Sequence, residues 1–535
     1  MPIIEVWATI RPVRAFNSAI LATALIVIAA CRQNREIAQP VTLVVSLTGD
    51  PGPLNPAVTT SGNTHPVTDQ IFNGLVGLDE SLQPVPELAE SWRIEDSGRV
   101  YRFVLRKDVS WHDGRAFTSA DVKFTFEEAL LKYHSRTRAA LTDLVSAIET
   151  PGPHEVVFRL KRPYGPLLQR LDVVEASIIP KHAFVGEDLL SGAPTRRPIG
   201  TGPFKFVSYA PADRVVLEKN ASYFRRGLPG VDRLVFRIMP NAATSVAALE
   251  QGEIDYVGSV AGPDLERLRH TQGIAVVAGS GGSGGSICQD VLIPNLSRPP
   301  LGDVRVRRAI MAALDRPFVV DRVYFGQGRP ATGPISHLLA WAYTPDVRQY
   351  PHDTAVAERW LDEAGLRRAR GGERFAVTFT HANTQQRFAQ AVREQLKGVG
   401  VTVNLQTLDF NAAVDRVFVK KDFDLGMASY CNGADPDIGV RRVYVSSNIG
   451  PLPFSNGAGY HNDRVDRLFD EAAELVDRES RRARYAQIQR ILADEVPYFW
   501  IIDSEGLRAH RTAFEGFRLW TGALAETVHV TGQSR

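Results

Sequence analysis

Residues 430–442, YCNGADPDIGVRR, hold a cysteine, an asparagine, two aspartates and two adjacent arginines. Carboxylates and guanidinium groups at such short spacing could bind a charged solute, hold a metal ion or transfer protons. We interpret the polar positions as candidate ligand-binding residues: Tyr430, Asn432, Asp435, Asp437, Arg441 and Arg442. The alternative is a polar turn, in which the aspartates bond to nearby backbone N–H groups and the arginines face solvent.

Metal binding and catalysis receive little support from the sequence. The DPD triplet lacks the further oxygen ligands of a calcium loop, and no His-Glu-x-x-His pattern occurs. Ser283 lies in GGSGG, which formally matches the nucleophile elbow of serine hydrolases, but the following SICQDVLIPNLSRPP is broken by prolines and shows no helical face. We therefore expect no catalytic residue, no metal and no cofactor. A secreted hydrolase using Ser283 is the remote alternative.

The elements before the candidate segment predict where it lies. Between residues 373 and 430, the strands RFAVTFTH, VTVNLQTL and FDLGMASY alternate with the helices NTQQRFAQAVREQLKGVG and NAAVDRVFVKK. Such alternation predicts parallel pairing in an open α/β sheet, with Asn383 or Thr384 capping the first helix. Ligands bind beyond the carboxyl ends of such strands, and the candidate segment begins where the third strand ends.

The composition is that of a soluble protein with several cores. At 535 residues the chain is longer than one hydrophobic core serves, which predicts two or more lobes. Its 62 Lys and Arg nearly balance its 60 Asp and Glu. With a net charge of +2, no strong field attracts nucleic acid, so a nucleic-acid partner is not expected.

The N-terminus has the pattern of a bacterial export signal. Arg11 and Arg14 precede an uncharged stretch at residues 15–30, which is short for a membrane span and ends in two alanines before Cys31. The Ile-Ala-Ala-Cys sequence resembles a lipobox, which predicts cleavage and lipidation at Cys31. An uncleaved anchor helix is the alternative. The remaining cysteines, Cys288 and Cys431, form a disulfide or stay as free thiols.

A longer block points to a known family. Residues 87–127, ELAESWRIEDSGRVYRFVLRKDVSWHDGRAFTSADVKFTFE, are followed in order by PIGTGPFKF, PPLGDVRVRRAIMAALDR and ILADEVPYFWI. These blocks resemble those of the family 5 extracellular solute-binding proteins, the receptors of dipeptide, oligopeptide and nickel ABC importers. The resemblance covers nearly everything after residue 40.

The resemblance implies an α/β fold, the two-lobed periplasmic-binding-protein clamshell with an extra subdomain on the N-terminal lobe. The expected divisions are a lipoprotein signal peptide at 1–31, lobe I at 40–75, 195–285 and 505–535, an inserted subdomain at 76–194, and lobe II at 286–504.

The implied function is a monomeric receptor without catalytic activity, anchored by lipid at the periplasmic or extracytoplasmic face of the membrane. It would capture a peptide or peptide-like solute and deliver it to the permease and ATPase subunits of an ABC importer. An opine-like conjugate, an oligosaccharide or a chelated metal is the alternative cargo, and signalling in place of uptake is an alternative outcome of binding.

The candidate segment departs from the family pattern at one position. Peptide-binding members carry an aspartate four positions before the loop's proline, where it pairs with the free amine of the peptide. Counting back from Pro436 reaches Asn432, which offers no opposite charge to an ammonium group. Simple dipeptides are therefore doubtful cargo, whereas Arg441 and Arg442 suit an anionic conjugate. The family also implies a disulfide between Cys288 and Cys431.

Overall fold

The structure is a computed structural model that describes residues 40–260, 262–280, 287–519 and 522–532. Cys31 and Ser283 lie outside these residues. The chain divides into two units, residues 1–41 and 42–535, and the fold described below belongs to the second unit.

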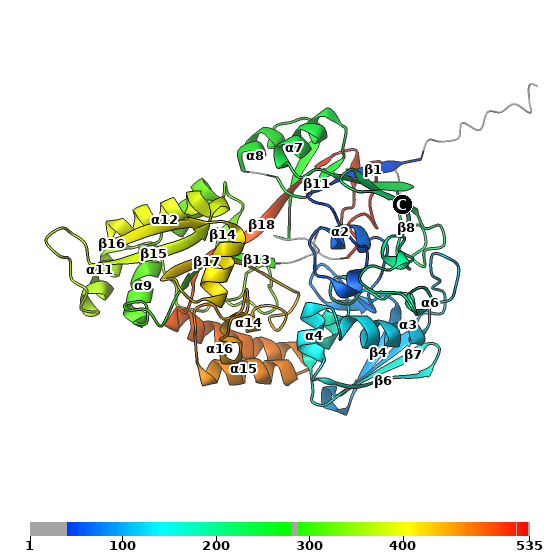
Figure 1. The fold of residues 1–535 in the computed structure, drawn as a ribbon, viewed down its shortest axis with the longest axis horizontal. Helices are drawn as coiled ribbons and strands as arrows, with labels where there is room; N and C mark the ends of the chain where they lie inside the picture. Colours follow the sequence, from blue (N-terminus) through cyan, green and yellow to red (C-terminus); the bar gives the residue numbers. More distant parts are fainter. Residues whose placement is uncertain (1–39, 261, 281–286, 520–521, 533–535) are drawn as a thin grey trace, which may run out of the picture. The chain divides into compact units, whose positions relative to one another are not determined.

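The predicted alternation of strands and helices before the candidate segment is confirmed. β15 (Phe375–Ala382) pairs in parallel with β16 (Val401–Leu408) and with β17 (Leu425–Asn432), as Figure 1 shows. Between the strands lie α12 (Gln386–Gly398) and α13 (Phe410–Val414), the latter continued by a π-helical turn. α12 buries Phe388, Val392 and Leu396 against this sheet, as the helical spacing of these residues predicts.

The predicted cap of α12 is wrong in detail. Residues Asn383–Gln385 form a short 3-10 turn ahead of the helix. The side chain of Gln385 accepts a hydrogen bond from the backbone N–H of Ala382 at 3.1 Å. Because of this turn, the helix begins at Gln386, after Asn383 and Thr384, which were the predicted capping residues.

The sheet is mixed, because antiparallel strands continue it. β13 (Ile287–Pro294) pairs antiparallel with β17 on one side and with the long β18 (Phe499–Arg511) on the other. β18 also pairs with β14 (Gly328–Pro330), β12 (Ile274–Ser280) and β11 (Tyr256–Val257). The sheet then continues through β1 (Thr42–Leu47), β10 (Arg233–Ile238), β9 (Arg214–Lys219) and β8 (Phe204–Ala210).

A separate antiparallel sheet has the strand order β4-β5-β7-β6. Its strands are β4 (Ala89–Glu95), β5 (Val100–Leu105), β6 (Val145–Gly152) and β7 (Glu155–Leu160). Apolar residues alternate along β5, and Tyr101, Phe103 and Leu105 are fully buried. The following helix α3 (Ser119–Phe124) begins with a capping box of Thr118 and Asp121.

Short helices lie before β6 and after β7 in the sequence, and two of them contribute residues to the candidate site. They are α4 (Ser135–Leu141), the 3-10 helix Gly165–Arg170 and α5 (Val173–Ala176). On the C-terminal side, α14 (Arg441–Tyr444), α15 (Asp463–Glu474) and α16 (Arg478–Glu495) follow β17. Val465, Leu468 and Phe469 of α15 are buried, as its apolar spacing predicts.

Candidate functional site

A cavity of about 600 Å³ lies between two stretches of chain that are distant in the sequence. One wall comes from residues 135–170 and the other from residues 431–473. The charged side chains of its lining are Arg136, Arg162, Arg170, Asp437, Arg441 and Arg442. Asp437, Arg441 and Arg442 therefore meet at one cavity, together with arginines that the sequence analysis did not single out.

Asp437 connects the two walls. Its carboxylate accepts a short hydrogen bond from the hydroxyl of Tyr164, and Nη2 of Arg170 lies 3.4 Å from its Oδ2. Arg170 also donates to the backbone carbonyl of Asp437 at 3.2 Å. Burial raises the pKa of Asp437, but the charges of Arg170 and Arg441 outweigh it and hold the pKa below its usual value. Asp437 is thus a buried, ionised group.

The two adjacent arginines differ in their partners. Arg441 lies 2.5 Å from Asp470 and 3.8 Å from Asp437. Arg442 donates only a long hydrogen bond of 3.5 Å to the carbonyl of Cys431, and its Nε has no partner among the described residues. Burial lowers the pKa of Arg442, because it removes water from around the guanidinium charge.

On the opposite wall, a buried carboxylate holds two more arginines. Nη1 of Arg136 lies 3.2 Å from Glu175, and Nη1 of Arg170 lies 4.0 Å from the same carboxylate. Burial raises the pKa of Glu175, but the neighbouring positive charges of Arg136 and Arg170 bring it below its usual value. Glu175 is therefore ionised and fixes both guanidinium groups.

Asp435 lies in an internal ion pair. Its carboxylate, with 0% exposed side chain, faces Arg481 with two N–O distances of 2.6 Å. Tyr485 adds a hydrogen bond at 3.2 Å. Since both oxygens of Asp435 are engaged by Arg481, a solute would reach this carboxylate only by breaking a buried pair.

Tyr430 and Asn432 both belong to β17, which extends two residues beyond the predicted end of the strand at Tyr430. Tyr430 is 3% exposed and donates to the carbonyl of Ser455. Asn432 is 5% exposed, and its Oδ1 has no hydrogen-bond partner among the described residues. Gly439, with a φ of +123°, packs so closely on Asn432 that a side chain there would overlap it.

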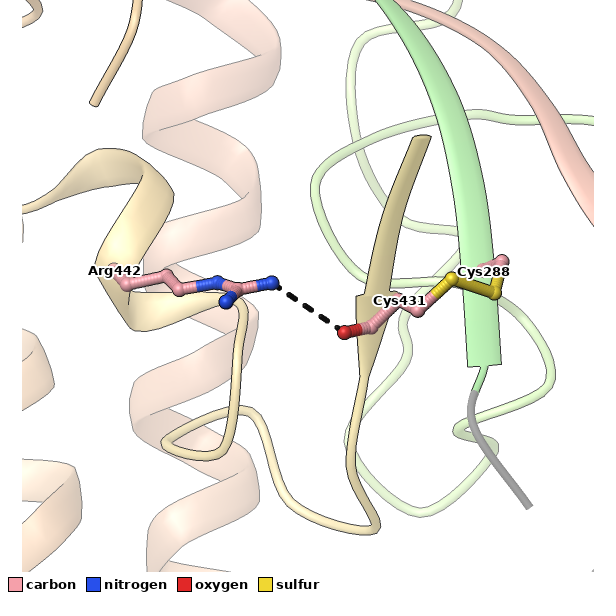
Figure 2. The surroundings of a disulfide bond; sticks show 3 residues. All are labelled: Cys288, Cys431 and Arg442. Carbon is pink, nitrogen blue, oxygen red and sulfur yellow. Dashed lines mark hydrogen bonds between the residues drawn. A yellow bond between two sulfur atoms is a disulfide. The ribbon is translucent and has the colours of Figure 1, made fainter. Parts of the chain in front are cut away.

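The structure contains a disulfide between Cys288 of β13 and Cys431 of β17, which are directly opposite in the antiparallel pair (Figure 2). Figure 2 also shows the guanidinium group of Arg442 extending towards the carbonyl of Cys431. The disulfide thus fixes the end of the strand that Arg442 contacts.

Apolar residues complete the cavity. Leu452, Pro453 and Phe454 line it, and the side chain of Leu452 is 59% exposed. These residues, Tyr164 and the three arginines of the first wall are not among the residues predicted from the sequence. No local motif marks them, and Tyr164 and Arg170 reach Asp437 only through contacts between segments 273 and 267 residues apart.

Two further observations concern metal ligands and membrane spans. Among the described residues, no group of three or more His, Cys, Asp or Glu side chains is arranged to hold a metal ion. Within the same residues, every helix is too short or too polar to cross a membrane.

Comparison with known proteins assigns the family. Residues 83–451 match the family model of the bacterial extracellular solute-binding proteins, family 5. The chain belongs to this family, as its sequence blocks predict, and it is a transport binding protein and not an enzyme.

Relatives match over most of their length. The oligopeptide-binding protein AppA of Bacillus subtilis is 29% identical over 89% of this chain and 88% of the relative. The dipeptide-binding protein of Escherichia coli is 28% identical over 90% and 91% of the two chains.

Solved structures confirm the predicted α/β periplasmic-binding-protein fold. AppA of Bacillus subtilis in complex with a nonapeptide has a TM-score of 0.73 at 27% identity, covering 92% of this chain and 100% of the other. HbpA2 of Haemophilus parasuis has a TM-score of 0.80 at 24% identity over the same shares.

Proposed function

We propose that this protein is the receptor of an ABC importer and binds a peptide or peptide-like solute in the cavity between residues 135–170 and 431–473. The observation that carries the proposal is the convergence of three candidate residues, Asp437, Arg441 and Arg442, on this cavity. Its volume of about 600 Å³ is within the range of small-molecule sites. The oligopeptide- and dipeptide-binding relatives support a peptide-like cargo.

The division into lobes is part of this proposal. We place the boundary between lobes I and II within β18, between residues 504 and 505. In support, Ser504 pairs with β13 and β14, whereas Glu505 pairs with Ser280 of β12. The antiparallel sheet β4-β5-β7-β6 falls inside the proposed subdomain at 76–194.

The location is an extracytoplasmic one, with the chain held at the membrane by a lipid on Cys31. The export pattern of residues 1–31 supports this location, and family membership agrees with it. A monomer would then deliver its solute to permease and ATPase subunits.

Thermal unfolding of the full-length protein in detergent tests the cargo. The panel contains di- and oligopeptides, opine-like conjugates, oligosaccharides and chelated nickel. A ligand at one hundred times its dissociation constant stabilises the folded state by about 2.7 kcal/mol, which raises the unfolding midpoint measurably. We expect stabilisation by peptides or peptide-like conjugates. Stabilisation by oligosaccharides or the metal chelate alone would contradict the proposal.

A further inference from the structure

We propose that Arg442, together with Arg136, binds a carboxylate or phosphate group of the solute. This inference rests on the proposed function and specifies the class of solute. Both residues line the cavity, one on each wall.

Counting charges at the cavity shows an unmatched cation. The lining contains five arginines and one carboxylate, Asp437. Three carboxylates outside the lining also pair with these arginines. Glu175 contacts Arg136, Asp470 contacts Arg441, and Glu474 lies 3.9 Å from Arg162. Together with the pair of Arg170 and Asp437, each of these four arginines therefore has a carboxylate partner. Among the described residues, Arg442 is the fifth arginine and has none.

The hydrogen bonds of Arg442 are also incomplete. A guanidinium group has five N–H donors in a planar fork that matches a carboxylate or phosphate. Among the described residues, Arg442 finds an acceptor for one of them, in the 3.5 Å bond to the carbonyl of Cys431. If Arg442 had a purely structural role, its fork would meet several carbonyls, as Arg307 does with those of Leu301, Gly302, Glu495 and Val496.

The second wall strengthens the same conclusion. Nε of Arg136 is buried and has no hydrogen-bond partner among the described residues, although its Nη1 faces Glu175. The charge of Arg136 helps to lower the pKa of Arg442, after the larger effect of burial, so the two cations repel. An anion between them would relieve this repulsion and complete both sets of donors.

The rest of the lining indicates what the anion is attached to. Leu452, Pro453 and Phe454 give the cavity an apolar side, with Leu452 largely uncovered. A solute with an anionic end and an apolar body would cover these side chains and pair with Arg442. A peptide-like molecule with a free carboxylate or a phosphorylated side chain fits this description.

Calorimetry with three matched peptides tests the inference. All are N-acetylated leucine-containing tripeptides: one has a free carboxylate, one is the carboxamide, and one is the carboxamide with a central phosphoserine. We expect the wild-type protein to bind at least one anionic peptide about tenfold or more tightly than the plain carboxamide, because hydrogen bonds to charged groups are the stronger ones. The two anionic peptides distinguish carboxylate from phosphate.

Variants assign the preference to Arg442. The substitution Arg442→Gln should reduce the ratio between the affinity for the preferred anionic peptide and the affinity for the plain carboxamide to near one. Arg393→Gln removes an equivalent charge from the exposed surface of α12 and should leave the ratio unchanged. Arg442→Lys keeps the charge without the planar fork, so it should retain only part of the preference for the anionic peptide. This variant tests the inference if the glutamine variant does not fold.

The outcomes separate this inference from the proposed function. If the plain carboxamide binds as tightly as both anionic peptides, or if the two glutamine variants behave alike, the anion site is wrong while the peptide receptor stands. If none of the three peptides binds and only non-peptide solutes stabilise the protein, both proposals fall.

Discussion

Asn432 is a buried amide whose Oδ1 has no partner among the described residues, at the position where peptide-binding relatives are expected to carry an aspartate. Asparagine and aspartate have nearly the same shape, so Asn432→Asp fits beneath Gly439 without overlap. The new carboxylate should pair with the free amine of a peptide and improve binding by about 1–3 kcal/mol. Calorimetry with a simple dipeptide should therefore detect binding to the variant but little to the wild-type protein.

The N-acetylated form of the same dipeptide is the control, because it has no ammonium group and should gain nothing from the substitution. Tight binding of simple dipeptides by the wild-type protein, or identical behaviour of the two proteins, would show that Asn432 does not occupy the amine position. Asp435 would be a poor substitute for this role, since its carboxylate is already paired with Arg481.

At the scale of elements, the disulfide joins β13 and β17 beside the cavity. It links residues 143 positions apart, so it restricts the unfolded chain strongly. Replacing both Cys288 and Cys431 by serine should lower the free energy of unfolding by about 2–5 kcal/mol. Denaturant unfolding measures this change.

A reductant provides the matching control for the disulfide. It should lower the unfolding midpoint of the wild-type protein and leave that of the double serine variant unchanged. Mass spectrometry of unreduced peptides that finds two free thiols would contradict the bond itself.

At the scale of the whole folded unit, Asp437 joins segments 267 residues apart in the sequence through Arg170. The substitution Asp437→Asn removes the charge that faces Arg170 and weakens the acceptor for Tyr164. Breaking a buried ion pair in this way costs about 3–5 kcal/mol of unfolding free energy. Because the pKa of Asp437 is lowered in the folded protein, its contribution is present above the ordinary carboxyl pKa and is lost as the pH falls through the lowered value.

Denaturant unfolding near neutral pH and under acid conditions measures the loss of unfolding free energy in Asp437→Asn and its dependence on pH. Asp470→Asn is the control, because it removes the same charge from an exposed pair with Arg441 and should cost under about 1 kcal/mol. If the two variants lose the same free energy of unfolding, the contact of Asp437 with Arg170 contributes no more than a surface ion pair.

The family, the fold class and most of the local elements could be predicted from the amino-acid sequence. The strands and helices between residues 373 and 430 could be predicted because apolar spacing depends only on neighbouring residues. The candidate segment could be found because ligand sites follow the ends of parallel strands.

Which candidate residues share a cavity could not be predicted from the sequence, because it depends on contacts between distant segments. The residue types of Asp435 and Asp437 are the same, yet one is paired with Arg481 inside the protein and the other contacts Arg170 on the opposite wall. Arg441 and Arg442 are neighbours in sequence, and only the second lacks a carboxylate partner among the described residues. Their surroundings come from distant segments, and the charge that a side chain meets depends on how those segments fold together.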